Sequence, residues 1–173
     1  DPDMQAGDIK KIQQLVETKI LPNADFRKAT ALAMGHSWNQ ATAEQQAQIL
    51  KEFKVLLIRT YAGAISQIRD QTVEFKPLRA SPEDTIVTVR TGVINHGENV
   101  PINYRLYKTC DNPKELPKAC TQFSWKVVDI NVLGAWLVEV YRSQFKQQIS
   151  QGGIDSLIKF LQERNNSLIN DEG

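Results

Sequence analysis

This chain has little of what a metal site or a nucleophilic enzyme requires. Its 173 residues include only two histidines and two cysteines. It has no G-x-S-x-G elbow, phosphate-binding P-loop, G-x-G-x-x-G fingerprint or H-E-x-x-H helix. His36 and His96 lie next to glycine in turn-like sequences, where an exposed side chain is expected rather than a general base. The sequence therefore predicts no cofactor, no metal and no catalytic residue.

Long apolar runs and an excess of one charge are also missing. The longest unbroken apolar run has four residues, whereas a membrane-spanning helix needs about 20. Lysine and arginine number 21 and aspartate and glutamate 20, for a formal net charge of +1, and no basic stripe is visible. These features argue against nucleic-acid binding and steady membrane adhesion, and they leave brief docking open. No signal peptide is recognisable, which we expect of a mature chain and which does not favour the cytoplasm.

The two cysteines, Cys110 and Cys120, flank a short segment that contains two prolines. Two free thiols, a metal site and a disulfide bond are the alternatives. The spacing is not C-x2-C and both histidines are distant in sequence, which argues against a metal. We expect a disulfide that closes a loop between two strands, with free thiols as the alternative. Such a bond indicates an oxidising compartment such as the periplasm.

Apolar residues recur every three or four positions in the first part of the chain, as in amphipathic helices. We expect helices over residues 8–20 and 25–35, and a long helix over residues 42–69. Thr42 and Gln45 have the spacing of a capping box at its start. Apolar side chains surround much of the long helix, so we expect a sheet on one side of it and either other helices or a ligand on the other.

From residue 72 the apolar period changes to two, which is typical of strands. Short reversals separate these strands, so we expect a four-stranded antiparallel meander. In the last strand the alternation predicts that Trp125, Val127 and Asp129 share one face. A helical period resumes near Leu133 and is interrupted at Gly152–Gly153.

The order of helices, strands and helices predicts an α+β fold in one domain over residues 1–173, with residues 166–173 frayed. We expect a curved four-stranded antiparallel sheet with helices packed over one face. Apolar surfaces on the sheet and on two helices can either fill a core or enclose a pocket, and periodicity alone does not separate these alternatives.

The segment from Trp125 to Phe145 reads W-K-V-x-D-x-x-V-x-G-x-x-L-V-x-x-Y-R-S-Q-F. This pattern resembles the signature of the MlaC-type periplasmic phospholipid-binding proteins, the toluene-tolerance family. The I-L-P-x-x-D-F run at residues 20–26, followed by Gly35 and Trp38, is similar to the N-terminal half of the same family.

The resemblance implies a periplasmic carrier whose α+β fold encloses an apolar lipid cavity. Such a carrier binds a glycerophospholipid by its acyl chains and shuttles it between an outer-membrane lipoprotein complex and an inner-membrane ABC-type lipid transporter. This transport would serve outer-membrane lipid asymmetry. A carrier that docks in turn with two complexes is expected to be a monomer, and the lipid is cargo rather than a cofactor.

The residues expected to contact lipid lie on the long helix, the sheet and the last helix. They are Phe53, Leu57, Ile58, Tyr61, Ile65, Tyr104, Leu106, Trp125, Val127, Val132, Trp136, Val140, Tyr141 and Phe145. Lys126 and Arg142 are the neighbouring cations that could meet a head group.

Two other functions compete with lipid carriage. The first is a protein-interaction module with a filled core and no ligand cavity. The second is an enzyme acting on a hydrophobic substrate, with Asp129 as general base, which requires Asp129 to be buried and to point into the pocket. The structural alternative is that Asp129 lies at the strand end and hydrogen-bonds the following turn.

Overall fold

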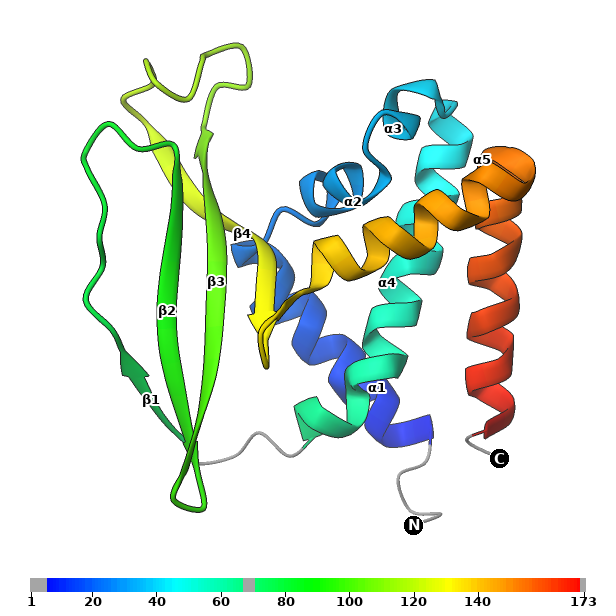
Figure 1. The fold of residues 1–173 in the computed structure, drawn as a ribbon, viewed down its shortest axis with the longest axis horizontal. Helices are drawn as coiled ribbons and strands as arrows, with labels where there is room; N and C mark the ends of the chain where they lie inside the picture. Colours follow the sequence, from blue (N-terminus) through cyan, green and yellow to red (C-terminus); the bar gives the residue numbers. More distant parts are fainter. Residues whose placement is uncertain (1–5, 67–70, 172–173) are drawn as a thin grey trace.

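The computed structural model describes residues 6–66 and 71–171 (Figure 1). Its elements in chain order are α1 (Ala6–Leu15), a π-helical turn (Val16–Ile20), a 3-10 turn (Leu21–Asn23), α2 (Phe26–Met34), α3 (Ser37–Gln40), α4 (Ala43–Ser66), β1 (Thr72–Phe75), β2 (Ile86–Asn95), β3 (Glu98–Cys110), β4 (Phe123–Val132), β5 (Ala135–Trp136) and α5 (Leu137–Asp171). The α+β fold is therefore confirmed. The helices gather beside β4, and the connection between β1 and β2 lies on the far side of the sheet (Figure 1).

The long helix α4 begins at the predicted capping box. The backbone N–H of Gln45 donates to the Thr42 hydroxyl at 3.1 Å, and the backbone N–H of Thr42 donates to the Gln45 side chain at 2.9 Å. These two bonds satisfy N–H groups that the first turn of a helix leaves unpaired. The helix is described as far as Ser66, and the last three residues of the predicted range lie outside the described part of the chain.

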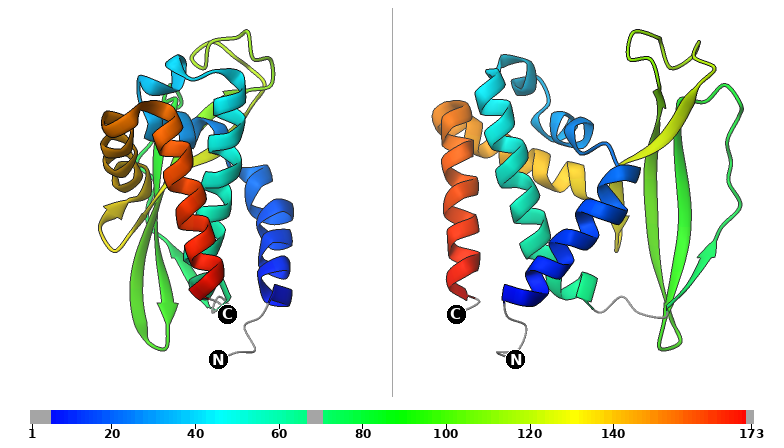
Figure 2. Two further views of the ribbon diagram at one scale, coloured as in Figure 1. Left: turned by 90° about the vertical axis from the view of Figure 1, so that its right-hand side faces the viewer. Right: turned by 180° about the vertical axis from the view of Figure 1, so that it is seen from behind.

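Gly152 and Gly153 break α5 into two helical halves. Gly152 has φ −160° and ψ 20°, and Gly153 has φ 78° and ψ −167°, both outside the helical region. The positive φ of Gly153 is readily adopted only by glycine. As a result the second half turns back and runs beside α4 (Figure 2).

The predicted fraying of the C-terminal end is not seen for residues 166–171, because α5 stays helical to Asp171. The last two residues of the predicted range lie outside the described part of the chain. The reason that α5 stays helical is tertiary packing. Leu168 packs against the helical core, and the buried side chain of Asn165 donates to the backbone and side-chain oxygens of Glu52 at 3.0 and 2.8 Å. These contacts tie the last turns of α5 to α4.

The helices build a core of their own around three aromatic rings. The ring of Phe53 meets those of Tyr141 and Phe145 edge-on, with centroids 5.0 Å apart in both pairs. Phe145 and Leu157 are completely buried. A smaller cluster between α1 and α4 consists of Ile12, Val16, Ile58 and Ala62. The helices thus bury a core among themselves that contains no residue of the sheet.

The sheet has five antiparallel strands in sequential order, so the predicted count of four was one too low. The additional strand is β5, which pairs with the end of β4 through a two-residue turn at Leu133 and Gly134. Both turn residues have positive φ, 52° and 85°, as in the type I′ turns that suit tight hairpins. His96 and Gly97 form the same kind of turn between β2 and β3, with φ of 49° and 84°.

A disulfide joins Cys110 at the end of β3 to Cys120 in the loop that leads to β4. The backbone N–H of Asp111 also donates to the carbonyl of Gln122 at 3.0 Å. The loop is therefore closed at its base by one covalent bond and one hydrogen bond.

Replacing Cys110 and Cys120 together by alanine should lower the free energy of unfolding by about 2.5–3 kcal/mol, because the bond no longer restricts the unfolded chain. Urea unfolding of the oxidised protein and the double variant measures this difference. The single variants are the controls and should be as unstable as the double variant. Equal stability of all four proteins would contradict the prediction.

Candidate functional site

One face of the sheet is predominantly apolar. Val87 and Val89 of β2 lie directly opposite Leu106 and Tyr104 of β3, and residues directly opposite in antiparallel strands share a face. The same face continues on β4. Its members there are Trp125, Val127, Ile130 and Val132. The predicted residues of the sheet are therefore brought together on one surface.

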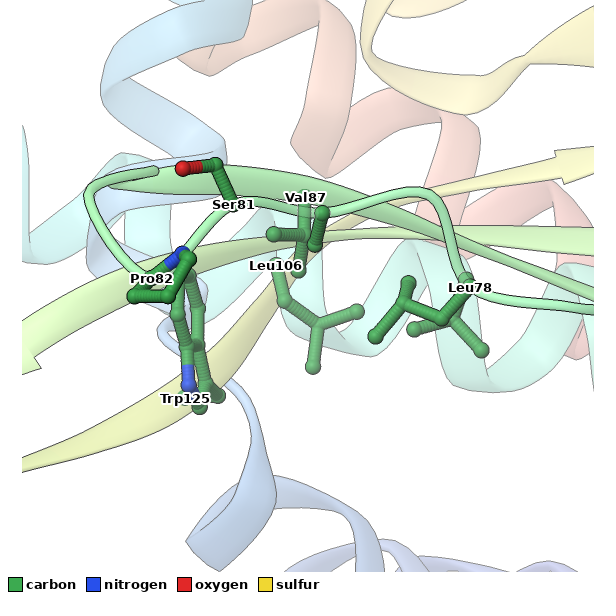
Figure 3. A pocket seen from close by; sticks show the side chains of 8 residues that line it. Leu78, Ser81, Pro82, Val87, Leu106 and Trp125 are labelled. Atoms are coloured by element: carbon green, nitrogen blue, oxygen red, sulfur yellow. The ribbon is translucent and has the colours of Figure 1, made fainter.

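A pocket of about 410 Å³ lies on this face. Its walls are almost entirely apolar and consist of Leu78, Ala80, Ser81, Pro82, Val87, Val89, Leu106 and Trp125 (Figure 3). Small-molecule sites commonly have volumes of about 300–1,000 Å³ and mostly apolar walls. The pocket therefore has the size and chemistry of a binding site for a hydrocarbon group.

The loop between β1 and β2 forms the outer wall of the pocket. Figure 3 shows Leu78, Ser81 and Pro82 on this loop, beside the strand side chains. A turn fixes its tip, since the backbone N–H of Ser81 donates to the Asp84 carboxylate at 2.8 Å. The side chain of Leu78 is nevertheless 57% exposed. The loop thus covers the apolar face only in part.

The polar atoms within this face have partners. Thr91 is buried, and its hydroxyl donates to the carbonyl of Ile102 at 2.6 Å. Tyr104 shares a side-chain hydrogen bond with Thr91, and burial raises the pKa of the Tyr104 phenol. Tyr104 is therefore a neutral hydroxyl in the physiological range, which keeps the face uncharged around it.

The predicted residues on the helices occupy a different part of the molecule. Phe53, Tyr141 and Phe145 lie in the helical core and do not line the pocket. Tyr61 shares a side-chain hydrogen bond with Tyr141, whose pKa is raised first by burial. The other predicted helical residues lie in several places.

Leu57 borders the helical core, and Ile58 belongs to the α1–α4 cluster. The guanidinium carbon of Arg105 lies 4.2 Å from the centroid of the Trp136 ring. Val140 is partly exposed, and the side chain of Ile65 is not among those that the structure describes.

The alternation predicted that Asp129 shares a face with Trp125 and Val127. This prediction is wrong. The pairing of β3 with β4 shifts between Arg105 and Leu106, and Val128 is the extra residue of this bulge. Asp129 consequently lies opposite Arg105, on the face away from the pocket. The hypothesis of Asp129 as a general base in the pocket is therefore wrong in its geometry.

Asp129 instead fastens the start of α5 to the sheet. The residue is 6% exposed, and its Oδ1 accepts hydrogen bonds from the backbone N–H groups of Ile130 at 2.9 Å and Val138 at 3.0 Å. The Arg105 guanidinium lies 4.0 Å from Oδ2. Burial raises the pKa of Asp129, and the two N–H groups and Arg105 oppose that shift.

The two cations considered for a head group already have backbone partners. Lys126 donates to the carbonyl of Pro22, and Arg142 donates to the carbonyl of Leu32 at 2.9 and 3.1 Å. Lys126 thereby connects β4 to the 3-10 turn, and Arg142 connects α5 to the last turns of α2. These hydrogen bonds hold neighbouring elements of the fold together.

Six residues of the pocket were missed by the sequence analysis. Val87 and Val89 could have been found, because pairing β2 with β3 across the His96–Gly97 turn puts them opposite Tyr104 and Leu106. The other four, from Leu78 to Pro82, lie in a loop without periodicity and carry no comparable signal.

Among residues 6–66 and 71–171, no cluster of His, Cys, Asp and Glu side chains is suited to hold a metal ion. In the same ranges, no helix combines the length and apolar character that crossing a membrane requires. The pocket on the sheet is lined almost entirely by apolar side chains. An open antiparallel sheet, one apolar face and a separate helical core define an α+β protein whose sheet presents an apolar pocket.

Comparison with known proteins identifies the family. The model of the MlaC protein family matches residues 1–163. The intermembrane phospholipid transport system binding protein MlaC of Haemophilus influenzae is 22% identical over 152 residues, which are 88% of this chain and 67% of that protein. A solved phospholipid-binding protein from Ralstonia solanacearum, in complex with a phospholipid, is 49% identical and has a TM-score of 0.83. The match covers 98% of this chain and 88% of that one. The chain belongs to the MlaC family.

The raised pKa of Asp129 predicts how stability depends on pH. The folded state holds the proton more tightly than the unfolded state, whose ordinary pKa is 3.8. The contribution of this group to stability is therefore full below pH 3.8 and is lost as the pH rises through the folded-state pKa. Asp129→Asn does not titrate, and its amide oxygen can still accept from Val138. We expect the stability of the variant relative to the wild type to increase as the pH rises from 3.8 through the raised folded-state pKa of Asp129.

Urea unfolding at a series of pH values measures this difference. A variant whose stability relative to the wild type is constant over the series would contradict the prediction. The variant should also retain lipid carriage, and loss of carriage in a well-folded variant would restore a functional role for the carboxylate.

Proposed function

We propose that this protein is a periplasmic carrier of phospholipid that places acyl-chain carbon against the apolar sheet face and its pocket. One observation carries the proposal: a protein with 49% identity and the same fold was solved with a phospholipid bound. The pocket supports it, because apolar walls on strands of the same sheet suit hydrocarbon and little else. Trp125, Leu106 and Val89 are the strand residues we assign to the acyl chains.

The free energy of carriage fits this role. Burying hydrocarbon is worth about 0.8 kcal/mol for each CH2, so two acyl chains are worth on the order of 20 kcal/mol relative to water. A bilayer offers almost the same environment. A carrier can therefore hold its lipid firmly in water and still exchange it with a membrane protein at little net cost.

The proposed partners are an inner-membrane ABC-type lipid transporter and an outer-membrane lipoprotein complex, between which the carrier shuttles lipid as a monomer. The support is the family and the curated relative, whose name describes an intermembrane phospholipid transport system. The disulfide agrees with an oxidising compartment. Maintenance of outer-membrane lipid asymmetry is the role we assign to this transport.

Native mass spectrometry of freshly purified protein, followed by extraction and identification of lipid, tests the proposal. We expect about one bound phospholipid per chain, as the binding of a single ligand at a single site requires. Protein of bare mass with nothing extractable would instead favour the interaction module, whose defining property is a surface without cargo.

Filling the pocket should displace lipid. Val89→Trp places an indole among the pocket walls and excludes at least two or three CH2 groups, which costs about 2 kcal/mol, or more than about tenfold in affinity. The matched control is Thr88→Trp, since Thr88 is exposed on the same strand and faces the other side of the sheet. Lipid per chain, measured by mass spectrometry after identical purification, should fall for Val89→Trp and not for Thr88→Trp.

Thermal unfolding of both variants shows whether the pocket position is ordinary core. If Val89→Trp keeps its lipid, the acyl chains do not occupy this pocket. If both variants lose lipid equally, the loss reflects damage to the sheet rather than a filled site.

A further inference from the structure

A second pocket lies on the helical side of the molecule, where the 3-10 turn, α2 and α4 meet. It has a volume of about 460 Å³ and is lined by Leu21, Phe26, Arg27, Leu50, Lys51 and Lys54. It shares no lining residue with the pocket on the sheet. We call it the cationic pocket, because three of its six residues are positively charged.

The apolar floor of the cationic pocket consists of Leu21, Phe26 and Leu50, and it packs on the interior of the helical half. Phe26 packs on Phe53 of the helical core, with ring centroids 5.6 Å apart. Leu21 packs against the α1–α4 cluster. Leu50 is half-buried on α4, one residue before Lys51. A floor supported by two packed clusters keeps its shape without a ligand.

The rim of the pocket carries an excess of positive charge. The Arg27 guanidinium is fixed by a 2.9 Å hydrogen bond to the Gln46 side chain, and it lies 5.1 Å from the centroid of the Trp38 ring. Lys54 has one acidic neighbour, Glu17, at 4.0 Å. In the described part of the chain, no carboxylate forms an ion pair with Lys51. Among the described residues, the three rim cations thus share one ion-paired carboxylate, that of Glu17.

We propose that the cationic pocket docks a protein segment that presents an apolar side chain flanked by carboxylates. The floor accepts the apolar side chain, and the rim cations, one of them already oriented, meet the carboxylates. This proposal rests on the proposed function, because a carrier that exchanges lipid with membrane complexes must dock on proteins. The segment belongs to such a complex.

A protein segment fits the pocket better than a lipid surface does. The positive charge is local, while the whole chain has a formal net charge of only +1, so general attraction to an anionic bilayer is weak. The pocket is also concave, and a protruding side chain can fill it, whereas a plane of head groups meets only the rim. Complementary charge on the partner would speed association and select orientation.

Lys51→Glu tests the proposal, because it reverses charge at the rim on an exposed helix position. The probes are the purified inner-membrane and outer-membrane complexes of the same transport system, each held in nanodiscs. We expect Lys51→Glu to bind at least one of them about tenfold more weakly at about 50 mM salt, with a smaller difference at about 300 mM, because salt screens rim charges.

Two further variants serve as controls, and a third tests the apolar floor. Lys159→Glu makes the same change of charge at an exposed position outside the pocket, where Lys159 pairs with Glu163 at 3.8 Å. It should bind like the wild type. Lys51→Arg keeps the charge and should also bind normally. Leu50→Ala shortens the floor and should weaken binding at both salt concentrations, because this contribution is apolar.

Other outcomes overturn the proposal. Equal binding of Lys51→Glu and wild type to both complexes, or no binding of the wild type to either, would do so. Weakened binding seen only with protein-free anionic vesicles would assign the pocket to a membrane surface instead. Lipid per chain, measured in parallel, separates this proposal from the proposed function: Lys51→Glu should carry a full complement of lipid, whereas wild type without lipid would refute the carrier itself.

Discussion

The β-bulge at Val128 is the constraint on which the arrangement of the molecule depends. One extra residue in β4 leaves Trp125 and Val127 on the apolar face and moves Asp129 to the opposite one. On that side the carboxylate accepts from the N–H of Val138 in the first turn of α5 and lies beside Arg105. The same residue shift therefore keeps a buried charge out of the apolar surface and uses it to attach the helices. A regular strand would bring the carboxylate onto the apolar face.

The helices and the sheet bury their apolar surfaces separately. Phe53, Tyr141 and Phe145 complete a packed core among the helices, so the apolar face of the sheet is not required to complete it. The loop that carries Leu78 and Pro82 covers the apolar face of the sheet on its outer side, and it leaves apolar side chains exposed to solvent. An apolar surface that is not buried in the core is available to a ligand, and such surfaces commonly mark binding sites.

Much of this fold could be predicted from the sequence, and the failures have identifiable physical causes. The helical period and the glycine pair gave the elements of α4 and α5, because both signals are local. The strand β5 was missed because two residues cannot display a period. The face of Asp129 was predicted wrongly because a bulge shifts the alternation by one residue, and alternation is the only local signal of a face. The loop wall of the pocket was missed because Leu78 and Pro82 are positioned by tertiary contacts rather than by a repeat.

A carrier of hydrocarbon faces a particular problem of specificity. An apolar protein surface and a bilayer stabilise an acyl chain almost equally, so affinity for lipid cannot determine where lipid is taken up or released. Selectivity must then come from contacts that no bilayer offers, and specificity is a difference between affinities for alternative partners. In this molecule the apolar sheet pocket and the cationic pocket share no residue. Substitutions in the proposed docking pocket can therefore change partner recognition without altering the surface proposed to hold the cargo.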